Sequence, residues 1–356
     1  MKKLLALALI LALALPFAAL AEDYDIAMIT DIGTIDDKSF NQGTWEGIVE
    51  YAQANNKTYH YYQPTSQSTE IYLDMIEQAV NDGADVIVTP GFLFEAPIFM
   101  AQDMYPEVHF ILIDGNPNDG DWSKANGPEY RTEANAVGIV YAEEQAGFLA
   151  GYAAVKDGYT KAGFMGGMAV PAVVRFGYGF AQGMEYAAKE MGIKDLKLNY
   201  HYTGGFAATP EAQALAASWY ADGIEVIFAC GGAVGDSVMA AAEAAGGKVI
   251  GVDVDQSSQS ETVITSAAKG LAASVVSVLT DFYNNNFPAG QALVMDAATD
   301  GVELPMANSR FNTFSQADYD AIFAKLVAGE VKLLKDSDVK AVTEIPLELV
   351  AVTEIQ

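Results

Sequence analysis

The chain alternates short apolar runs with longer stretches whose apolar positions follow helical spacing. Eight strand-like runs form two series, at residues 26–30, 59–62, 86–89 and 109–113 and then at 162–165, 198–202, 226–229 and 249–252. Helical stretches lie between them, at residues 39–54, 69–81, 143–155, 176–191, 210–220 and 237–245. This alternation is typical of parallel βαβ units, so we predict an α/β protein.

The two series are organised alike, which predicts two doubly wound lobes facing one another. Each series opens with a strand, a polar loop and a helix that starts near a phenylalanine, Phe40 or Phe176. We predict crossings between the lobes at residues 135–141, at 263–266 and after about Ala307. Residues 22–138 with 267–306 then form one lobe, and 139–266 with 307–356 form the other. We interpret the repeated Ala-Val-Thr-Glu-Ile at 341–345 and 351–355 as two strand-like pieces.

The N-terminus has the three parts of a secretory signal peptide. Lys2 and Lys3 precede an apolar run at residues 4–15, and Ala19-Leu20-Ala21 is a small-residue cleavage site. The run is short for a bilayer span, which needs ~20 residues. No cysteine stands near the site, so we expect cleavage after Ala21, no lipid anchor, and a periplasmic or secreted product. Cleavage leaves 335 residues, enough for two hydrophobic cores.

Composition excludes several classes of function. The formal charge of −28 repels phosphate backbones, so we expect no nucleic-acid partner. The single cysteine, Cys230, excludes an internal disulfide and follows a strand-like run, which favours a buried small hydrophobe. His60, His109 and His201 are scattered without the spacing of a zinc site, so we expect no metal and no cofactor.

The stretch after the first apolar run offers the clearest candidate chemistry. Ser39 followed by Gln42 predicts a capping box at a helix start. In a parallel sheet such a turn opens into the crevice at the carboxyl ends of the strands, where ligands bind. Asp31, Phe40 and Asn41 therefore offer a carboxylate, an aromatic face and an amide to one small solute.

Three carboxylates directly follow apolar strand runs, at Asp31, Asp114 and Asp253. A carboxylate at that place can accept two hydroxyl hydrogen bonds, such as those of a cis-diol, and charge-assisted bonds are strong. The alternative is that each caps a helix N-terminus. Lys269 either reaches such carboxylates and the ligand or is a solvated surface lysine.

Aromatic and glycine residues near these turns also have two interpretations. Phe40 and Phe176 either clamp a planar ring, at ~1–3 kcal/mol for stacking, or pack beneath their loops, and the residues alone favour packing. Gly91, Gly231 and Gly232 end strands where the backbone comes close to a ligand or makes a tight turn. We interpret Glu143 and Glu144 as structural, since a helix dipole favours acids in its first turn.

Several motifs, in their order and spacing, resemble the basic membrane protein family of substrate-binding proteins, whose best-known members are purine nucleoside receptors of ABC importers. The first is Thr30-Asp-Ile-Gly-Thr-Ile-Asp-Asp-Lys-Ser-Phe-Asn-Gln42. The others are Gly91-Phe92, Ile113-Asp114, residues 137–151, residues 171–180, Gly231-Gly232, residues 251–256 and residues 265–269. The resemblance covers nearly all of the chain after residue 21.

The resemblance implies a type I periplasmic-binding-protein fold, with two Rossmann-like lobes joined by a three-segment hinge. It implies a monomer that captures inosine, guanosine or adenosine in the interlobe cleft and delivers it to an ABC permease and its ATPase. By this resemblance, Asp253 would bind the ribose, and Asp31 together with Asn41 would bind the edge of the base. The full expected ligand-binding set is Asp31, Phe40, Asn41, Gly91, Phe92, Asp114, Phe176, Gly231, Gly232, Asp253 and Lys269.

Other functions remain open at this stage. The ligand is alternatively riboflavin, another ribosyl or ribityl compound, or a sugar, and the protein is alternatively a sensor subunit. An exported nucleoside-cleaving enzyme would need a nucleophile–base pair or a metal cluster. Asp36-Asp37 is the one dense carboxylate pair in the candidate motif, and no histidine accompanies it. We therefore favour a carrier with no catalytic residue.

Overall fold

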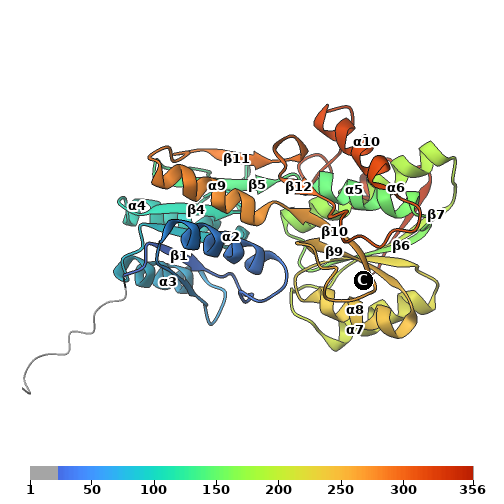
Figure 1. The fold of residues 1–356 in the computed structure, drawn as a ribbon, viewed down its shortest axis with the longest axis horizontal. Helices are drawn as coiled ribbons and strands as arrows, with labels where there is room; N and C mark the ends of the chain where they lie inside the picture. Colours follow the sequence, from blue (N-terminus) through green and yellow to red (C-terminus); the bar gives the residue numbers. More distant parts are fainter. Residues whose placement is uncertain (1–22, 356) are drawn as a thin grey trace, which may run out of the picture.

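The computed structural model describes residues 23–355, so the predicted signal peptide lies outside the described residues. Two sheets, one of six and one of seven strands, lie side by side, each covered by helices on both faces (Figure 1). We call each sheet with its helices a lobe. The predicted α/β class is confirmed, and each of the eight predicted strands and six predicted helices is present, with ends that differ by at most five residues.

The first lobe is built on a wholly parallel sheet of order β11-β5-β4-β3-β1-β2. Its strands are β1 (Ile26–Ile29), β2 (Tyr59–Tyr62), β3 (Val86–Pro90), β4 (His109–Ile113), β5 (Ala136–Tyr141) and β11 (Ala292–Met295). Its helices are α2 (Phe40–Asn55), α3 (Thr69–Asn81), α4 (Glu95–Met104), α9 (Leu271–Tyr283) and the 3₁₀ turn η1 (Phe92–Phe94). Alternate residues of β1 enter two different cores, because strand side chains point to opposite faces.

The second lobe has the sheet order β12-β10-β9-β8-β6-β7-β13, parallel except for the pairing of β12 with β10. Its strands are β6 (Lys161–Gly166), β7 (Leu196–Tyr202), β8 (Val226–Cys230), β9 (Lys248–Asp253), β10 (Val263–Lys269), β12 (Val302–Glu303) and β13 (Val350–Glu354). Its helices are α5 (Glu143–Lys156), α6 (Pro171–Met191), α7 (Pro210–Ala221), α8 (Val234–Ala245) and α10 (Gln316–Val327). Helices α5 and α6 pack together, as do α7 and α8.

The chain passes between the lobes three times, at Ala142, at Gly270 and at residues 296–301. Hydrogen bonds join these passages: the Ala142 N–H donates to the Met295 carbonyl, and the Gly270 N–H to the Gly301 carbonyl. The predicted crossings at 135–141 and 263–266 lie elsewhere, because both stretches are buried strands, β5 and β10. The lobe boundaries at 138, 266 and 306 shift accordingly by several residues.

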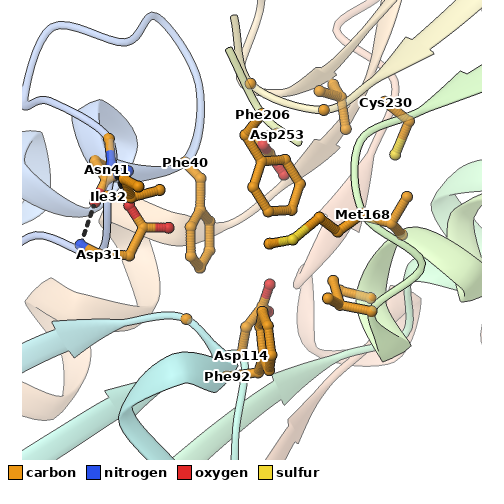
Figure 2. A pocket seen from close by; sticks show the side chains of 18 of the residues that line it. Asp31, Ile32, Phe40, Asn41, Phe92, Asp114, Met168, Phe206, Cys230 and Asp253 are labelled. Atoms are coloured by element: carbon orange, nitrogen blue, oxygen red, sulfur yellow. Dashed lines mark hydrogen bonds between the residues drawn. The ribbon is translucent and has the colours of Figure 1, made fainter. Parts of the chain in front are cut away.

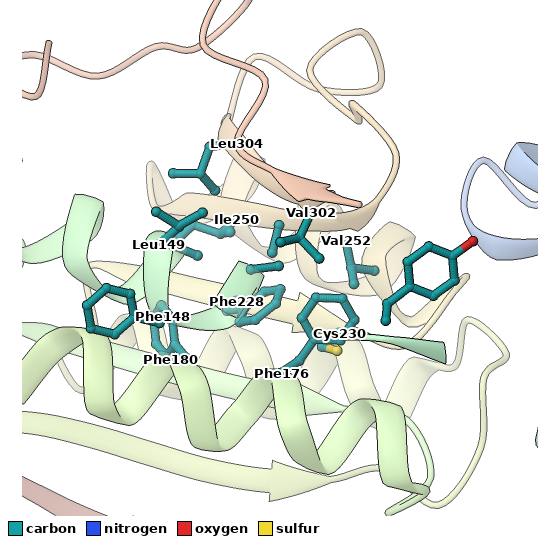
Figure 3. Packing of buried hydrophobic residues seen from close by; sticks show 14 of the residues in the cluster. Phe148, Leu149, Phe176, Phe180, Phe228, Cys230, Ile250, Val252, Val302 and Leu304 are labelled. Atoms are coloured by element: carbon teal, nitrogen blue, oxygen red, sulfur yellow. The ribbon is translucent and has the colours of Figure 1, made fainter. Parts of the chain in front are cut away.

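Helices α5 and α6 lie backbone to backbone, and glycines make this possible. A Cβ on Gly147 or Gly151 would lie 2.1 Å from a carbonyl oxygen of α6, and one on Gly179 or Gly183 would lie 2.1 Å from a carbonyl oxygen of α5. A phenylalanine-rich core fills the space between this pair and the sheet (Figure 3). The start of α5 is therefore fixed tightly against α6.

The repeated C-terminal pentapeptide takes two conformations. Its second copy lies in β13, which pairs with β7 at the sheet edge, whereas its first copy contains the 3₁₀ turn η3 (Val342–Glu344). The interpretation of two strand-like pieces is thus wrong for the first copy. The Glu185 carboxylate of α6 accepts hydrogen bonds from the N–H groups of Glu348, Leu349 and Val350, which fixes the chain directly before the second copy.

Candidate ligand-binding site

A cleft of about 960 Å³ lies between the lobes, where the carboxyl ends of the strands of both sheets meet (Figure 2). This is the crevice in which parallel sheets bind ligands. All eleven predicted binding residues line the cleft: Asp31, Phe40, Asn41, Gly91, Phe92, Asp114, Phe176, Gly231, Gly232, Asp253 and Lys269. Their distribution over both lobes allows one ligand to touch both.

On the first lobe, Asp31 and Asn41 form a small closed network. Asp31 Oδ1 accepts from the Gly33 N–H at 2.6 Å and from Asn41 Nδ2 at 2.9 Å, and the Asp31 N–H donates to Asn41 Oδ1. Burial raises the pKa of Asp31, while the hydrogen bonds from Gly33 and Asn41 oppose that rise. The second carboxylate oxygen, Oδ2, remains available for a ligand donor.

The start of α2 is capped by Asp37, so the predicted Ser39–Gln42 capping box is wrong. Asp37 accepts hydrogen bonds from the N–H groups of Ser39, Asn41 and Gln42. Ser39 makes no capping bond with its side chain. Because Asp37 satisfies the helix N-terminus, the Ser39 hydroxyl is free to point across the cleft.

Ser39 joins the two lobes. Its Oγ donates to Asp253 Oδ2 at 2.6 Å, and the side chain of Gln256 donates to the Lys38 carbonyl at 2.9 Å. Burial raises the pKa of Asp253, whereas the Lys269 charge and the Ser39 hydrogen bond lower it. One flank of the cleft is therefore closed by hydrogen bonds that include a predicted ligand-binding carboxylate.

Lys269 is buried among three carboxylates, with its side chain 2% exposed. Its Nζ lies 2.5 Å from Asp114 Oδ2, 3.3 Å from Glu143 Oε1 and 3.7 Å from Asp253 Oδ1. Burial alone would lower the Lys269 pKa, but the three carboxylates outweigh burial and raise it above its ordinary value. Lys269 is thus a buried ammonium, and the surface alternative is wrong.

Aromatic rings complete the surroundings of this ammonium. The Nζ lies 5.0 Å from the ring centre of Phe40, 5.2 Å from that of Phe176 and 5.4 Å from that of Tyr141. Each distance is within the range of a cation–π contact. Asp114 Oδ1, by contrast, is buried without a hydrogen-bond partner among the described residues. An unpaired acceptor beside a fixed cation favours a ligand that donates hydrogen bonds.

Phe176 does not mirror Phe40. Helix α6 begins at Pro171, so Phe176 is in its second turn, whereas Phe40 is the first residue of α2. Only 1% of Phe176 is exposed, and its ring packs edge-on against Phe228 at 5.8 Å (Figure 3). Proline is favoured at the first position of a helix, which explains the earlier start. The predicted equivalence of the two phenylalanines is therefore wrong.

Phe206 and Met168 lie where Phe176 was expected. Both side chains point from loops of the second lobe into the cleft toward Phe40 (Figure 2). Gly167 makes room for the aromatic ring, since a Cβ there would lie 2.4 Å from Phe206 Cδ1. The sequence signal was Gly204-Gly205-Phe206 two residues after a strand end, a pattern similar to that of Gly91-Phe92.

The three glycines among the predicted binding residues are required for different structural reasons. Gly91 has a φ of +108°, and a Cβ there would lie 3.6 Å from Phe40 Cε1, so it keeps the backbone close beside that ring. A Cβ on Gly231 would lie 2.7 Å from the Gly167 N–H nitrogen, so Gly231 packs against a neighbouring loop. Gly232 has a φ of +54° at the same turn.

Two charged residues were missed or misread from the sequence. Arg175 lines the cleft, and its Nε lies 3.0 Å from Glu143 Oε2. Glu143 is wholly buried between Arg175 and Lys269, so it is more than an acid at a helix start. The available signal was that two adjacent glutamates stand among apolar residues at the first crossing.

Residues 25–336 match the family model of PnrA-like ABC transporter substrate-binding proteins. The chain belongs to this family. The basic membrane protein resemblance is thereby confirmed, and the protein is a substrate-binding protein of the ABC transporter class. Within residues 23–355, no helix combines the length and apolar character needed to cross a bilayer.

Curated relatives extend over most of the chain. The chain is 27% identical to the ABC transporter nucleoside-binding protein BmpA of Lactococcus lactis, over 81% of this chain and 83% of the relative. It is 29% identical to basic membrane protein A1 of Borrelia garinii, over 86% of this chain and 87% of the relative. It is 30% identical to basic membrane protein B of Borreliella burgdorferi, over 80% of this chain and 81% of the relative.

Solved structures share the fold. A solute-binding protein of an ABC transporter system from Aeropyrum pernix superposes with a TM-score of 0.76 at 20% identity, covering 90% of this chain and 95% of that one. A periplasmic binding protein/LacI transcriptional regulator from Alkaliphilus metalliredigens superposes with a TM-score of 0.55 at 14% identity. The superposition covers 82% of this chain and 100% of that one. The predicted type I periplasmic-binding-protein fold is confirmed.

Proposed function

We propose that the protein captures a purine nucleoside in the interlobe cleft and delivers it to an ABC permease driven by an ATPase. The observation that carries the proposal is the pairing of two chemistries in one cleft. Two aromatic rings, Phe40 and Phe206, face the cleft, and two carboxylates that contact Lys269, Asp114 and Asp253, line the same cleft. A planar base with a hydroxylated sugar is complementary to both.

The sugar is assigned to Asp253 and Asp114. Both carboxylates contact Lys269, and Asp114 Oδ1 is still without a donor among the described residues. A ribose cis-diol supplies two donors to such a carboxylate, and bonds to a charged acceptor are the stronger kind. The base edge is assigned to Asp31 and Asn41, where Asp31 Oδ2 can accept from a ring N–H.

The name of a relative supports the same ligand class, since the Lactococcus lactis protein is a nucleoside-binding protein. The signal-peptide pattern supports action outside the cytoplasm, in the periplasm or as a secreted protein. We propose that the monomer is the functional unit, because one chain supplies both walls of the cleft.

A longer ligand is the second candidate. The cleft of about 960 Å³ is at the upper end of the ~300–1,000 Å³ range for small-molecule sites, so riboflavin is the alternative to a nucleoside. Calorimetric titration of protein stripped of ligand by unfolding and refolding tests both. We expect one-to-one binding of inosine, guanosine or adenosine and weaker binding of riboflavin. Binding of riboflavin alone, or of none of the four, contradicts the nucleoside proposal.

A further inference from the structure

Glu143 lies behind the cleft wall, at the point where the chain first passes between the lobes. It is the first residue of α5 and follows the passage residue Ala142. None of its surface is exposed, and it does not line the cleft itself. A wholly buried carboxylate is costly unless cations compensate it.

Two cations of the cleft wall provide that compensation. Glu143 Oε1 lies 3.3 Å from Lys269 Nζ, and Oε2 lies 3.0 Å from Arg175 Nε. Neither carboxylate oxygen has an aligned hydrogen bond from any described residue, so the contacts are ion pairs. Glu143 is therefore the anion that Lys269 and Arg175 share, and both of these cations line the cleft.

The backbone around Glu143 gives it little freedom to move. The Ala142 N–H is bonded to the Met295 carbonyl at 2.9 Å. On the other side, Gly179 of α6 packs so closely that a Cβ there would lie 2.1 Å from the Glu144 carbonyl oxygen. A fixed carboxylate between two long, flexible cationic side chains determines where their charged ends lie.

We propose that Glu143 is a positioning residue for ligand capture: its carboxylate holds Lys269 and Arg175 in place at the cleft wall, and neutralising it weakens ligand binding. Lys269 in turn fixes Asp114 and Asp253, the carboxylates assigned to ligand hydroxyls. The inference rests on the proposed nucleoside-binding function and adds that binding depends on pH near neutrality.

The pH dependence follows from the charges around Glu143. Burial raises the pKa of Glu143 to about 7, against the lowering effect of Arg175 and Lys269 and together with the raising effect of Asp114. Burial also raises the pKa values of the neighbouring Tyr141 hydroxyl and Cys230 thiol, so both stay neutral below pH 8. The other acids whose charges act on the Arg175 guanidinium are Asp336, 3.9 Å from Arg175 Nε, together with Asp114, Glu144 and Glu95.

The protonation state of Glu143 determines how pH changes the affinity for the ligand. Above pH 7 Glu143 is ionised and holds both cations. Below pH 7 it takes up a proton, so Lys269 and Arg175 lose the anion that they share, and their charged ends are no longer held in place at the cleft wall. The dissociation constant of the ligand should therefore rise as the pH falls from 8 to 6. Because one proton is taken up, this constant can change by at most about tenfold per pH unit.

Calorimetry with inosine at pH 8, 7 and 6 tests the proposal. We expect native protein to bind at least about fivefold more weakly at pH 6 than at pH 8. Glu143→Gln should bind weakly with a flat profile, because amide and protonated acid are alike in charge. Glu144→Gln is the matched control: burial raises the pKa of Glu144 as well, but its ion pair is with Lys335 and not with Lys269, so the variant should keep the native dependence on pH. A native profile retained by Glu143→Gln, or a flat native profile, overturns the proposal.

A measurement without ligand separates this inference from the proposed function. Carbon-13 and nitrogen-15 NMR can follow the Glu143 carboxyl and the Lys269 ammonium during a pH titration of ligand-free protein. Both signals should move with a common midpoint near 7, and the Lys269 movement should vanish in Glu143→Gln. A Glu143 midpoint below about 5, or a Lys269 signal that does not respond, overturns the positioning role even if inosine fails to bind.

Discussion

The turns that lead into α2 and α6 occupy corresponding places in the two lobes but serve the cleft differently. In the first lobe, Asp37 caps α2 directly before Phe40, so the ring lies at the helix start and faces the cleft. In the second lobe, α6 begins at Pro171, and the next turn carries Phe176 into the core. Two loop residues, Met168 and Phe206, join the first turns of α6 in the cleft wall of the second lobe.

The difference shows that similar strand–loop–helix order does not make two side chains equivalent. Because α6 begins five residues before Phe176, that ring is almost wholly buried in the core, although it still borders the cleft. The ring that faces Phe40 then comes from the segment between β7 and α7, which carries two adjacent glycines before Phe206. The first lobe therefore offers a partly exposed ring at a helix start, and the second lobe offers a partly exposed ring on a loop.

The largest expected effect is on stability, at Phe176. Because the ring is buried against Phe228 and the α5–α6 pair, Phe176→Ala should lower the free energy of unfolding by about 3–5 kcal/mol. Phe40→Ala should cost clearly less, since its ring is half-buried. Urea denaturation followed by circular dichroism measures both. Equal losses for the two variants would show that the two phenylalanines have the same environment after all.

The next effect is on affinity, at the rings that face the cleft. Phe40→Ala and Phe206→Ala should each weaken inosine binding by about 1–3 kcal/mol, because each removes one stacking face. Titration calorimetry on variants with native circular dichroism gives the values. Val174→Ala, a half-buried side chain of α6 that does not line the cleft, is the control and should bind like native protein. Unchanged affinity in Phe206→Ala would remove the loop from the ligand wall.

A smaller effect is expected at Ser39, which belongs to the first turn but bonds to the second lobe. Its hydroxyl occupies Asp253 Oδ2, an acceptor that the ribose is proposed to use. Ser39→Ala should therefore tighten inosine binding, by about 0.5–1.5 kcal/mol, the net value of one hydrogen bond. Calorimetry with 2′-deoxyinosine, which lacks one ribose hydroxyl, is the comparison: the gain in affinity should be smaller for this ligand than for inosine. Weaker inosine binding in Ser39→Ala would mean that the hydroxyl assists the ligand.

The sequence predicted the elements and the polar residues at strand ends well. Periodicity located the strands, and a side chain directly after a parallel strand must lie near the cleft, which placed Asp31, Asp114 and Asp253 there. The crossings were harder, because β5 and β10 are apolar strands whose sheet is decided by tertiary pairing.

The partners of the side chains in the cleft could not be predicted from the local sequence. Either Asp37 or Ser39 can cap the same helix, and the choice depends on Asp253, 214 positions away from Ser39. Glu143 and Glu144 are adjacent acids in one turn, yet only Glu143 points to Lys269, whose position is set by a different strand. Such contacts are fixed by how the lobes pack.

A crystal structure of the protein grown with inosine tests the central claim most directly. The account predicts the purine ring between Phe40 and Phe206, the ribose hydroxyls on Asp253 and Asp114, and Phe176 still in the core. A purine stacked on Phe176, or inosine bound outside the cleft, would contradict the account.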